Sequence, residues 1–316
     1  MANKFTHLHL HTMYSLRDGI TDPEALMKRC ANNGMPNVAV TDHGNLMGAW
    51  YCAKYAKKYG INFIPGNEVY VVPDVQKCRG QEWSKGKSHH LVLLAYNQEG
   101  WENLLAITTR SNVEGYYYQP RVDYSMLRDH SAGLFAHTAC LGGPTAKAFV
   151  NGSSVHLVAE MYREIFADRL SLEIQINGHE AQIPYNDALI KVSNDTGIPL
   201  VATVDSHYLE KKDSHKQDLL FCLGMDKVLD DPARHRYPAE CFSVETPDEV
   251  NKKFVTRYGD TGRKAIARTM EIAENCDVNI EIETKNYKIP SVKVAEAEDY
   301  AEYIEWKSRL IGARDV

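Results

Sequence analysis

The chain has 316 residues, of which 44% are hydrophobic and 25% charged, and its formal net charge is -6. This composition is typical of a folded globular protein with one large domain or two ordinary ones. The negative charge gives no support for binding nucleic acid over a broad basic surface. No apolar run approaches the roughly 20 residues that a membrane span needs. The polar start and the seven scattered cysteines, with no CxxC pair, favour a reduced, cytoplasmic protein without a membrane partner.

Short apolar runs alternate with amphipathic stretches along most of the chain. The predicted strands occupy residues 5–10, 37–42, 62–72, 90–96, 133–139, 170–176 and 199–205. The predicted helices cover residues 22–34, 45–60, 98–113, 153–167, 180–196, 211–223 and 246–258. The first helix has Asp22 as its cap, Pro23 in its first turn and Gly34 as its stop. Seven alternations predict a parallel α/β protein, and periodicity alone leaves both an open sheet and a closed barrel possible.

The C-terminal part of the chain has a different pattern. Residues 263–277 read as a helix, 279–294 as an extended connector, and 297–315 as a final helix with no strand after it. We therefore predict a first domain over residues 1–270 and a connector with a short helical extension over 271–316.

Residues able to bind metals follow most of the predicted strands. The stretch HLHLHT places three histidines on one face of the first strand. Loops after the carboxyl ends of parallel strands build the site in α/β folds, so these side chains should meet. They are His7, His9, His11, Asp42, His43, Glu68, Cys140, Asp205 and His207.

His90 does not fit this pattern, because it stands at the start of the run LVLLAY and not at its end. Either that strand begins earlier, or it runs against its neighbours. We keep His90 as a candidate ligand under both alternatives.

Each of these residues taken alone also has an ordinary structural interpretation. His7 by itself reads as a surface histidine, and Cys140 as a small buried side chain. Asp18 and Gly19 could serve only a turn, and Asp42 could support a ligand without binding metal. The joint placement at strand ends is what favours a metal site.

Imidazole and carboxylate ligands together suit zinc, manganese or iron. A zinc ion needs about four ligands, so this set would serve two or three ions. Ions about 3.5–4 Å apart can hold both the attacking and the leaving oxygen of a phosphate. A shared carboxylate, by preference Glu68, could bridge them. The sequence thus predicts hydrolysis of a phosphoester, and the absence of a GxxxxGK[ST] motif argues against ATP use.

These motifs resemble the PHP (polymerase and histidinol phosphatase) family. HLHLHT resembles its opening HxH motif and TDHG its second motif, while GNE, HHLVLLA, TACLGG and VDSH match later ones. The resemblance implies a distorted seven-stranded (β/α) barrel and a set of nine metal ligands. The ligands would be His9, His11, Asp18, His43, Glu68, His90, Cys140, Asp205 and His207. We assign the catalytic role to His9, His11, Glu68, Asp205 and His207.

The stretches between the motifs are similar to one branch of this family, the PHP domains of bacterial replicative DNA polymerases. They are YSLRDG, TDHGNLMGA, GYYYQPRVD, LDDPARHRYP and FSVETPDEV, and the likeness runs from Phe5 to about residue 290. It implies a 3′–5′ exonuclease that proofreads DNA 3′ ends, with a palm-containing polymerase chain or other replication proteins as partners. No aspartate cluster of a palm follows the barrel, so we do not expect polymerisation by this chain alone.

Two other functions stay open from the sequence. The chain could be a metal-bound structural module that supports a polymerase, or a small-molecule phosphatase of the histidinol-phosphate type. The stretch GYYYQPR could be a contact surface or could cover the barrel bottom. Lys85, Lys87, Arg110 and Arg121 are candidate phosphate contacts, with solvated surface charge as the alternative.

Overall fold

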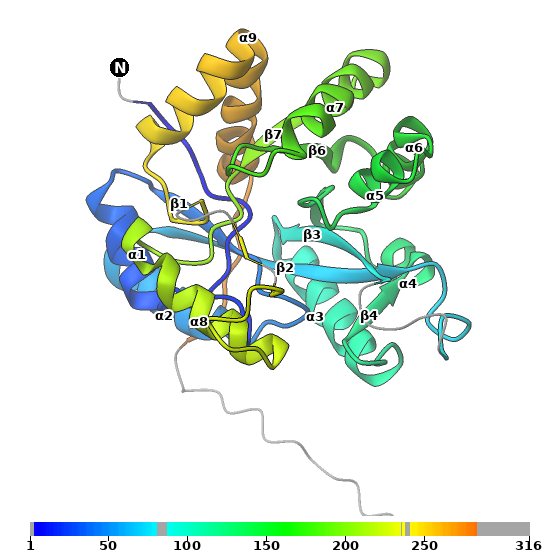
Figure 1. Cartoon of the computed structure of the whole chain (residues 1–316), viewed down its shortest axis with the longest axis horizontal. Helices are drawn as coiled ribbons and strands as arrows, with labels where there is room; N and C mark the ends of the chain where they lie inside the picture. Colours follow the sequence, from blue (N-terminus) through cyan, green and yellow to red (C-terminus); the bar gives the residue numbers. More distant parts are fainter. Residues whose placement is uncertain (1–2, 81–86, 235, 238–240, 283–316) are drawn as a thin grey trace, which may run out of the picture. The chain divides into compact units, whose positions relative to one another are not determined.

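The strands of the computed structural model form one curled sheet in the order β1-β2-β3-β5-β6-β7, and β4 pairs with β2 beside this path (Figure 1). The structure describes residues 3–80, 87–234, 236–237 and 241–282. The strands are β1 Asn37–Val40, β2 Asn62–Val72, β3 His89–Ala95, β4 Arg121–Asp123, β5 Leu134–His137, β6 Leu170–Gln175 and β7 Leu200–Thr203. The short β4 lies in the GYYYQPRVD stretch, where no strand was predicted.

β3 is the strand that runs against its neighbours. It pairs antiparallel with both β2 and β5, whereas the other pairs of the sheet are parallel. The register places His90 opposite Tyr70 and Val92 opposite Glu68. The start of β3 therefore lies beside the carboxyl-terminal half of β2, which confirms the second alternative for His90.

The N-terminal segment does not form the strand predicted over residues 5–10. It is extended, but its hydrogen bonds are shared between two neighbours, and a regular ladder forms with neither. Thr41 N donates to Leu10 O at 2.8 Å, and His11 N donates to Ser206 O at 2.7 Å. These bonds link the β1 edge of the sheet to the segment that follows β7. The curled sheet is thereby joined through the N-terminal segment, and the predicted distorted barrel is confirmed.

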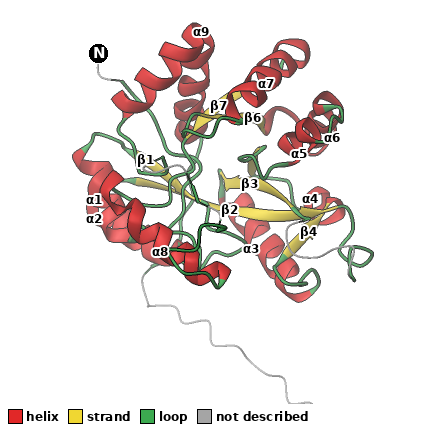
Figure 2. Ribbon diagram, viewed as in Figure 1, coloured by secondary structure: helices red, strands yellow, loops and turns green. Residues whose placement is uncertain are grey.

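Helices surround the sheet (Figure 2). They are α1 Pro23–Asn32, α2 Ala49–Tyr59, α3 Gln98–Val113, α4 Tyr124–Asp129, α5 Pro144–Val150, α6 Val155–Phe166, α7 Gln182–Thr196, α8 Ser214–Met225 and α9 Pro247–Glu274. Asp22 caps α1 as predicted, since its side chain accepts from Ala25 N at 2.9 Å. The predicted helices over residues 246–258 and 263–277 are one element, α9, which bends at Gly259, where φ is 55°. The short helices α4 and α5 were not predicted.

The core fills the sheet interior and the space under the helices. All four residues of β1 and all six of β6 are buried. In β1 this burial gives a nearly continuous apolar run, as is usual for strands buried on both faces. In β6 the polar Ser171, Glu173 and Gln175 are buried as well. Burial of each large apolar side chain contributes about 1.5–3 kcal/mol.

The compact unit runs from Met1 to Ile280. The predicted boundary near residue 270 stays a prediction, and most of the predicted connector and all of the final helix lie outside the described residues. Within the part of the chain that the structure describes, no helix is both long and apolar enough to cross a membrane.

Candidate metal centre

All nine predicted ligands lie in one cluster at the end of the sheet. His9 and His11 come from the N-terminal segment, and Glu68 and His90 from β2 and β3. The others stand in loops: Asp18 before α1, His43 after β1, Cys140 after β5, and Asp205 and His207 after β7. Contacts of 3.9 Å or less join all nine side chains. The cluster is assembled from seven separate stretches of the chain.

The Glu68 carboxylate lies at the middle of the cluster and is only 1% exposed. Its Oε2 is 2.8 Å from His43 Nδ1 and 3.2 Å from His11 Nε2. Its Oε1 is 2.9 Å from His90 Nδ1 and 3.4 Å from His9 Nε2. One carboxylate thus faces four imidazoles, as a ligand shared between ions would.

Asp205 approaches the same histidines from the opposite edge of the sheet. Its Oδ1 lies 3.1 Å from His9 Nε2 and 3.3 Å from His11 Nε2. Its φ of 59° is in the left-handed region that non-glycine residues seldom adopt, a strain that concentrates at functional sites. His9 Nε2, His11 Nε2 and Asp205 Oδ1 are buried and have no hydrogen-bond partner. Buried polar atoms are normally paired, so these three fit a bound cation.

Asp18 reaches the cluster because Gly19 lets its loop fold back tightly. A Cβ at Gly19 would lie 2.2 Å from Thr12 O, which no larger residue could accommodate without moving the loop. Asp18 Oδ2 then lies 3.1 Å from His43 Nε2 and 3.4 Å from His207 Nε2. Gly19 therefore serves the turn, and the same turn brings the candidate ligand Asp18 to the cluster.

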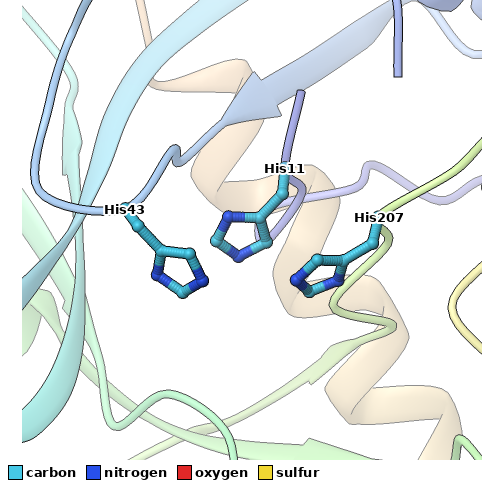
Figure 3. A group of neighbouring side chains, drawn as sticks. All are labelled: His11, His43 and His207. Atoms are coloured by element: carbon cyan, nitrogen blue, oxygen red, sulfur yellow. The ribbon is translucent and has the colours of Figure 1, made fainter. Parts of the chain in front are cut away.

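Three histidines from distant parts of the sequence face one another in Figure 3. The His11 ring lies between the other two, with its centroid 4.2 Å from that of His43 and 4.3 Å from that of His207. Among the described residues, three overlapping groups place their ligand atoms within 4.8 Å of one another. They are His11, His43 and His207; His9, His11 and Asp205; and His43, Glu68 and His90. The overlap is compatible with a multinuclear metal site.

Cys140 lies at the border of the cluster. Its Sγ is 3.9 Å from His90 Nδ1 and accepts from Gly142 N at 3.4 Å. Burial, together with the nearby Asp205 and Glu68 carboxylates, raises the pKa of the Cys140 thiol well above its ordinary value. The thiol is therefore neutral without an ion, and only a cation beside it would favour the thiolate.

Glu173 in β6 supports the cluster, and sequence reasoning missed it. Its Oε1 is 2.7 Å from His9 Nδ1 and also accepts from Thr203 Oγ1 at 2.5 Å and Gln175 Nε2 at 2.8 Å. A carboxylate only accepts, so His9 Nδ1 carries the proton and His9 Nε2 is left for an ion. The signal was a glutamate inside the apolar run LSLEIQI.

Ser15 orients two further ligands. Its hydroxyl donates to Asp42 Oδ1 at 2.7 Å, and its Oγ lies 2.8 Å from His11 Nδ1 and accepts from His43 N at 3.1 Å. Asp42 also accepts from Thr12 N and Thr12 Oγ1, both at 2.7 Å. Asp42 therefore contacts Ser15 and Thr12, and supports the candidate ligands through Ser15. This agrees with the interpretation that Asp42 supports a ligand without binding metal.

The carboxylates hold protons on the neighbouring imidazoles. Burial opposes protonation of His9, but Asp205, Glu173 and Glu68 outweigh it and raise the pKa of His9 well above its ordinary value. Burial likewise opposes the charge of Glu68, but His90, His9 and His43 hold its pKa well below the usual range. Without an ion, the cluster therefore balances its negative charge with protons.

Metal binding is expected to strengthen as the pH rises and to release protons. Burial opposes the charged form of His43 and His207, but neighbouring acidic groups, with Glu68 beside His43 and Asp18 beside His207, raise both pKa values above 6.5. An incoming ion must displace these protons. Calorimetric titrations in two buffers of different protonation enthalpy count the protons released. An affinity that stays constant from acid to alkaline pH would contradict this expectation.

The raised pKa values of these histidines make the free energy of unfolding of the metal-free chain depend on pH. A histidine whose folded-state pKa is raised contributes stability that is fully present below its unfolded value of 6.5 and is lost as the pH rises through the folded value. The metal-free chain should therefore lose stability on the alkaline side, whereas the metal-loaded chain should not. Urea unfolding with and without a chelator measures both.

Two interpretations of single residues are wrong, those of His7 and Arg121. His7 is not on the surface: it is 1% exposed, its Nε2 lies 2.9 Å from Glu245 O, and burial lowers its pKa to about 4. Arg121 is 3% exposed and donates to backbone carbonyls, including Gly115 O at 3.1 Å, so it serves the fold. Arg110 is ion-paired with Glu114 and Asp129, and its role as a phosphate contact stays a prediction. Lys87 is exposed, and Lys85 lies outside the described residues.

Two pockets border the cluster, and both include His90 among their lining residues. The larger, of about 680 Å³, is bordered by Asp18 and His43 and by Arg17, Tyr116 and Tyr118. The two tyrosines are 57% and 64% exposed. They therefore do not cover the bottom of the barrel but stand beside the candidate site. Arg17 is a possible phosphate contact that the sequence reasoning did not single out.

The comparisons with known proteins agree with this arrangement. The PHP domain model matches residues 7–177, more than half of the chain. The DNA polymerase III subunit alpha of Helicobacter pylori is 35% identical over 96% of this chain and 26% of its own length. Those of Thermus aquaticus and Deinococcus radiodurans are 36% and 34% identical over 95% of this chain, and over 25% and 23% of their lengths.

This chain thus spans about a quarter of the length of the curated relatives it matches. The matched region contains the HxH motif, the central glutamate and the β3 histidine that the structure brings together. On the family match and the geometry together, the chain belongs to the PHP domain family.

Proposed function

We propose that this chain is a metal-dependent phosphoesterase that removes nucleotides from the 3′ ends of DNA, as a proofreading 3′–5′ exonuclease does. The observation that carries the proposal is the gathering of eight candidate metal ligands around a ninth, Glu68, with buried ligand atoms that have no hydrogen-bond partner. Such a cluster is too rich in ligands for one ion. We infer two or three ions of zinc, manganese or iron.

The roles of the chain's own residues follow from their contacts. Divalent ions in such a cluster neutralise phosphate charge and lower the pKa of water. His9, His11 and Asp205 would hold one ion, and His11, His43 and His207 another, since their ligand atoms converge. Glu68 would be shared between ions. Glu173 and Ser15 keep the imidazole rings of His9 and His11 turned toward the cluster.

A role in replication is the second part of the proposal. It is supported by relatives that are DNA polymerase III alpha subunits. We infer that the partners are DNA 3′ ends and a palm-containing polymerase chain or other replication proteins. The described cysteines form no disulfide with one another, which is usual in a reducing compartment, so we place the reaction in the cytoplasm.

The test is hydrolysis of an end-labelled primer–template with a 3′ mismatch, with added manganese, added zinc or no metal. We expect stepwise loss of 3′ nucleotides by the wild-type chain. Replacing both His9 and His11 with alanine should abolish this loss and reduce bound metal, because both ions assigned above lose at least one nitrogen ligand.

A matched control removes two histidines that lie outside the cluster. His156 and His215 are exposed on α6 and α8, so changing both to alanine should leave hydrolysis intact. Hydrolysis that survives loss of His9 and His11 would reject the proposal. So would a wild-type chain that holds two or three ions and cuts no DNA, an outcome that favours a structural role in a polymerase.

A further inference from the structure

The smaller pocket beside the cluster, which we name the amide pocket, has one wall of uncharged polar side chains. It has a volume of about 210 Å³ and is bordered by Cys140, Asp205 and His207. Four side-chain amides line it, each no more than 3% exposed: Gln175, Asn177, Gln182 and Gln217. Among the described residues that line it there is no lysine or arginine. Such a wall suits a neutral group that forms hydrogen bonds, and not a phosphate.

Gln175 and Gln182 are joined to each other and to the Glu173 carboxylate by hydrogen bonds. Gln175 Nε2 donates to Glu173 Oε1 at 2.8 Å, and Gln182 Nε2 donates to Gln175 Oε1 at 3.1 Å. Gln182 Oε1 in turn accepts from Asn177 N at 3.0 Å. This chain of bonds starts at the carboxylate that orients His9 and ends at Asn177. The wall of the pocket is therefore fixed relative to the metal ligands.

Asn177 leaves an acceptor without a partner in this wall. Its side chain is 2% exposed, and its Oδ1 is buried and has no hydrogen bond. A buried amide oxygen without a donor destabilises a fold, so such atoms are rare unless a ligand supplies the donor. Phe242 and Leu141 add apolar surface to the same pocket. The combination suits the sugar and the flat base of a nucleoside.

The larger pocket has the opposite character. It is open, includes the cationic Arg17, and exposes the rings of Tyr116 and Tyr118. Cations position phosphates, and exposed aromatic rings stack on bases of single strands. Because both pockets border His90, a phosphate at the cluster would lie next to both of them. The larger one can take a strand, whereas the amide pocket has room for little more than one nucleoside.

We propose that the amide pocket binds the sugar and base of the 3′-terminal nucleoside, the unit that hydrolysis releases. This assignment rests on the proposed exonuclease function. Water adds its oxygen to the terminal phosphorus, and the bond from phosphorus to the penultimate 3′ oxygen breaks. That oxygen takes up a proton and becomes the new 3′ hydroxyl. The product in the amide pocket is a deoxynucleoside 5′-monophosphate.

The test compares deoxycytidine 5′-monophosphate with inorganic phosphate as ligands of the manganese-loaded 316-residue chain, by isothermal titration calorimetry. We expect the nucleotide to bind at least about 10-fold more tightly, the worth of one or more added hydrogen bonds. Asn177→Leu keeps the side-chain size but removes the acceptor. It should cancel most of this difference and leave the affinity for inorganic phosphate unchanged.

A melting temperature of Asn177→Leu equal to or above that of the wild type would show that the loss is not misfolding. Asn194→Leu, on the exposed far end of α7, is the matched control and should bind both ligands normally. Equal wild-type affinities for the two ligands, or nucleotide binding unaffected by Asn177→Leu, would overturn the assignment. Nucleotide binding that depends on Asn177 in a chain that cuts no DNA would uphold the pocket and reject only the exonuclease function.

Discussion

Replacing Glu68 with glutamine is expected to remove at least one metal ion per chain and to lower DNA hydrolysis by more than about 100-fold. The reason is that Glu68 contacts His9, His11, His43 and His90, so ligands of every candidate ion lose a shared negative partner. Changes to groups that only support ligands already cost about 10–100-fold in metal affinity or activity. Elemental analysis of the purified chain and the primer assay measure the two effects.

A glutamate on the surface provides the control for Glu68→Gln. Glu102 is exposed on α3, and its change to glutamine should alter neither metal content nor hydrolysis. If Glu68→Gln retained the wild-type number of ions, the shared-ligand role of Glu68 would be wrong. If it retained the ions but not the activity, Glu68 would act on the substrate and not on metal retention.

Replacing Glu173 with leucine is expected to weaken metal binding about 10–100-fold and to destabilise the metal-free chain. The change leaves His9 Nδ1, Thr203 Oγ1 and Gln175 Nε2 without their common acceptor. Each buried donor left unpaired costs about 1–3 kcal/mol. Urea unfolding of the metal-free chain gives the loss of stability, and a metal titration gives the loss of affinity.

Glu173→Gln separates these two effects. A glutamine keeps one carbonyl acceptor for the three donors but has no negative charge to hold the proton on His9 Nδ1. It should therefore recover much of the stability and less of the metal affinity. Normal metal binding by Glu173→Leu would show that His9 keeps its orientation without this contact.

Much of the candidate site could be predicted from the sequence because its ligands stand next to apolar runs. Glu68, Asp205 and His207 lie in or just after runs rich in β-branched residues, and such runs mark buried strands. The carboxyl ends of parallel strands meet at one edge, so the position along the chain indicated the position in space. The helix that begins after Asp22 was predicted for a similarly local reason, its cap and its first-turn proline.

The supporting residues could not be predicted in this way. Ser15 is not unusual for its local sequence, and the apolar run around Glu173 marks this residue as unusual without indicating its partner. The roles of both depend on partners far along the chain, Asp42 for Ser15 and His9 for Glu173. The unpaired oxygen of Asn177 is visible only once the wall of the amide pocket is assembled. Hydrogen bonds between residues far apart in the chain leave no periodic pattern in the sequence by which they could be predicted.

The sequence by itself determined which residues can bind metal and which segments are buried strands or capped helices, because both follow from residue type and short-range spacing. Only the tertiary structure decided that β3 runs antiparallel, which brings His90 to Glu68, and that the N-terminal segment bonds to both edges of the sheet. The physical reason is that side chains alternate with a period of two in both parallel and antiparallel strands. The direction of pairing is set by which neighbours a strand meets, and these neighbours come from distant parts of the chain.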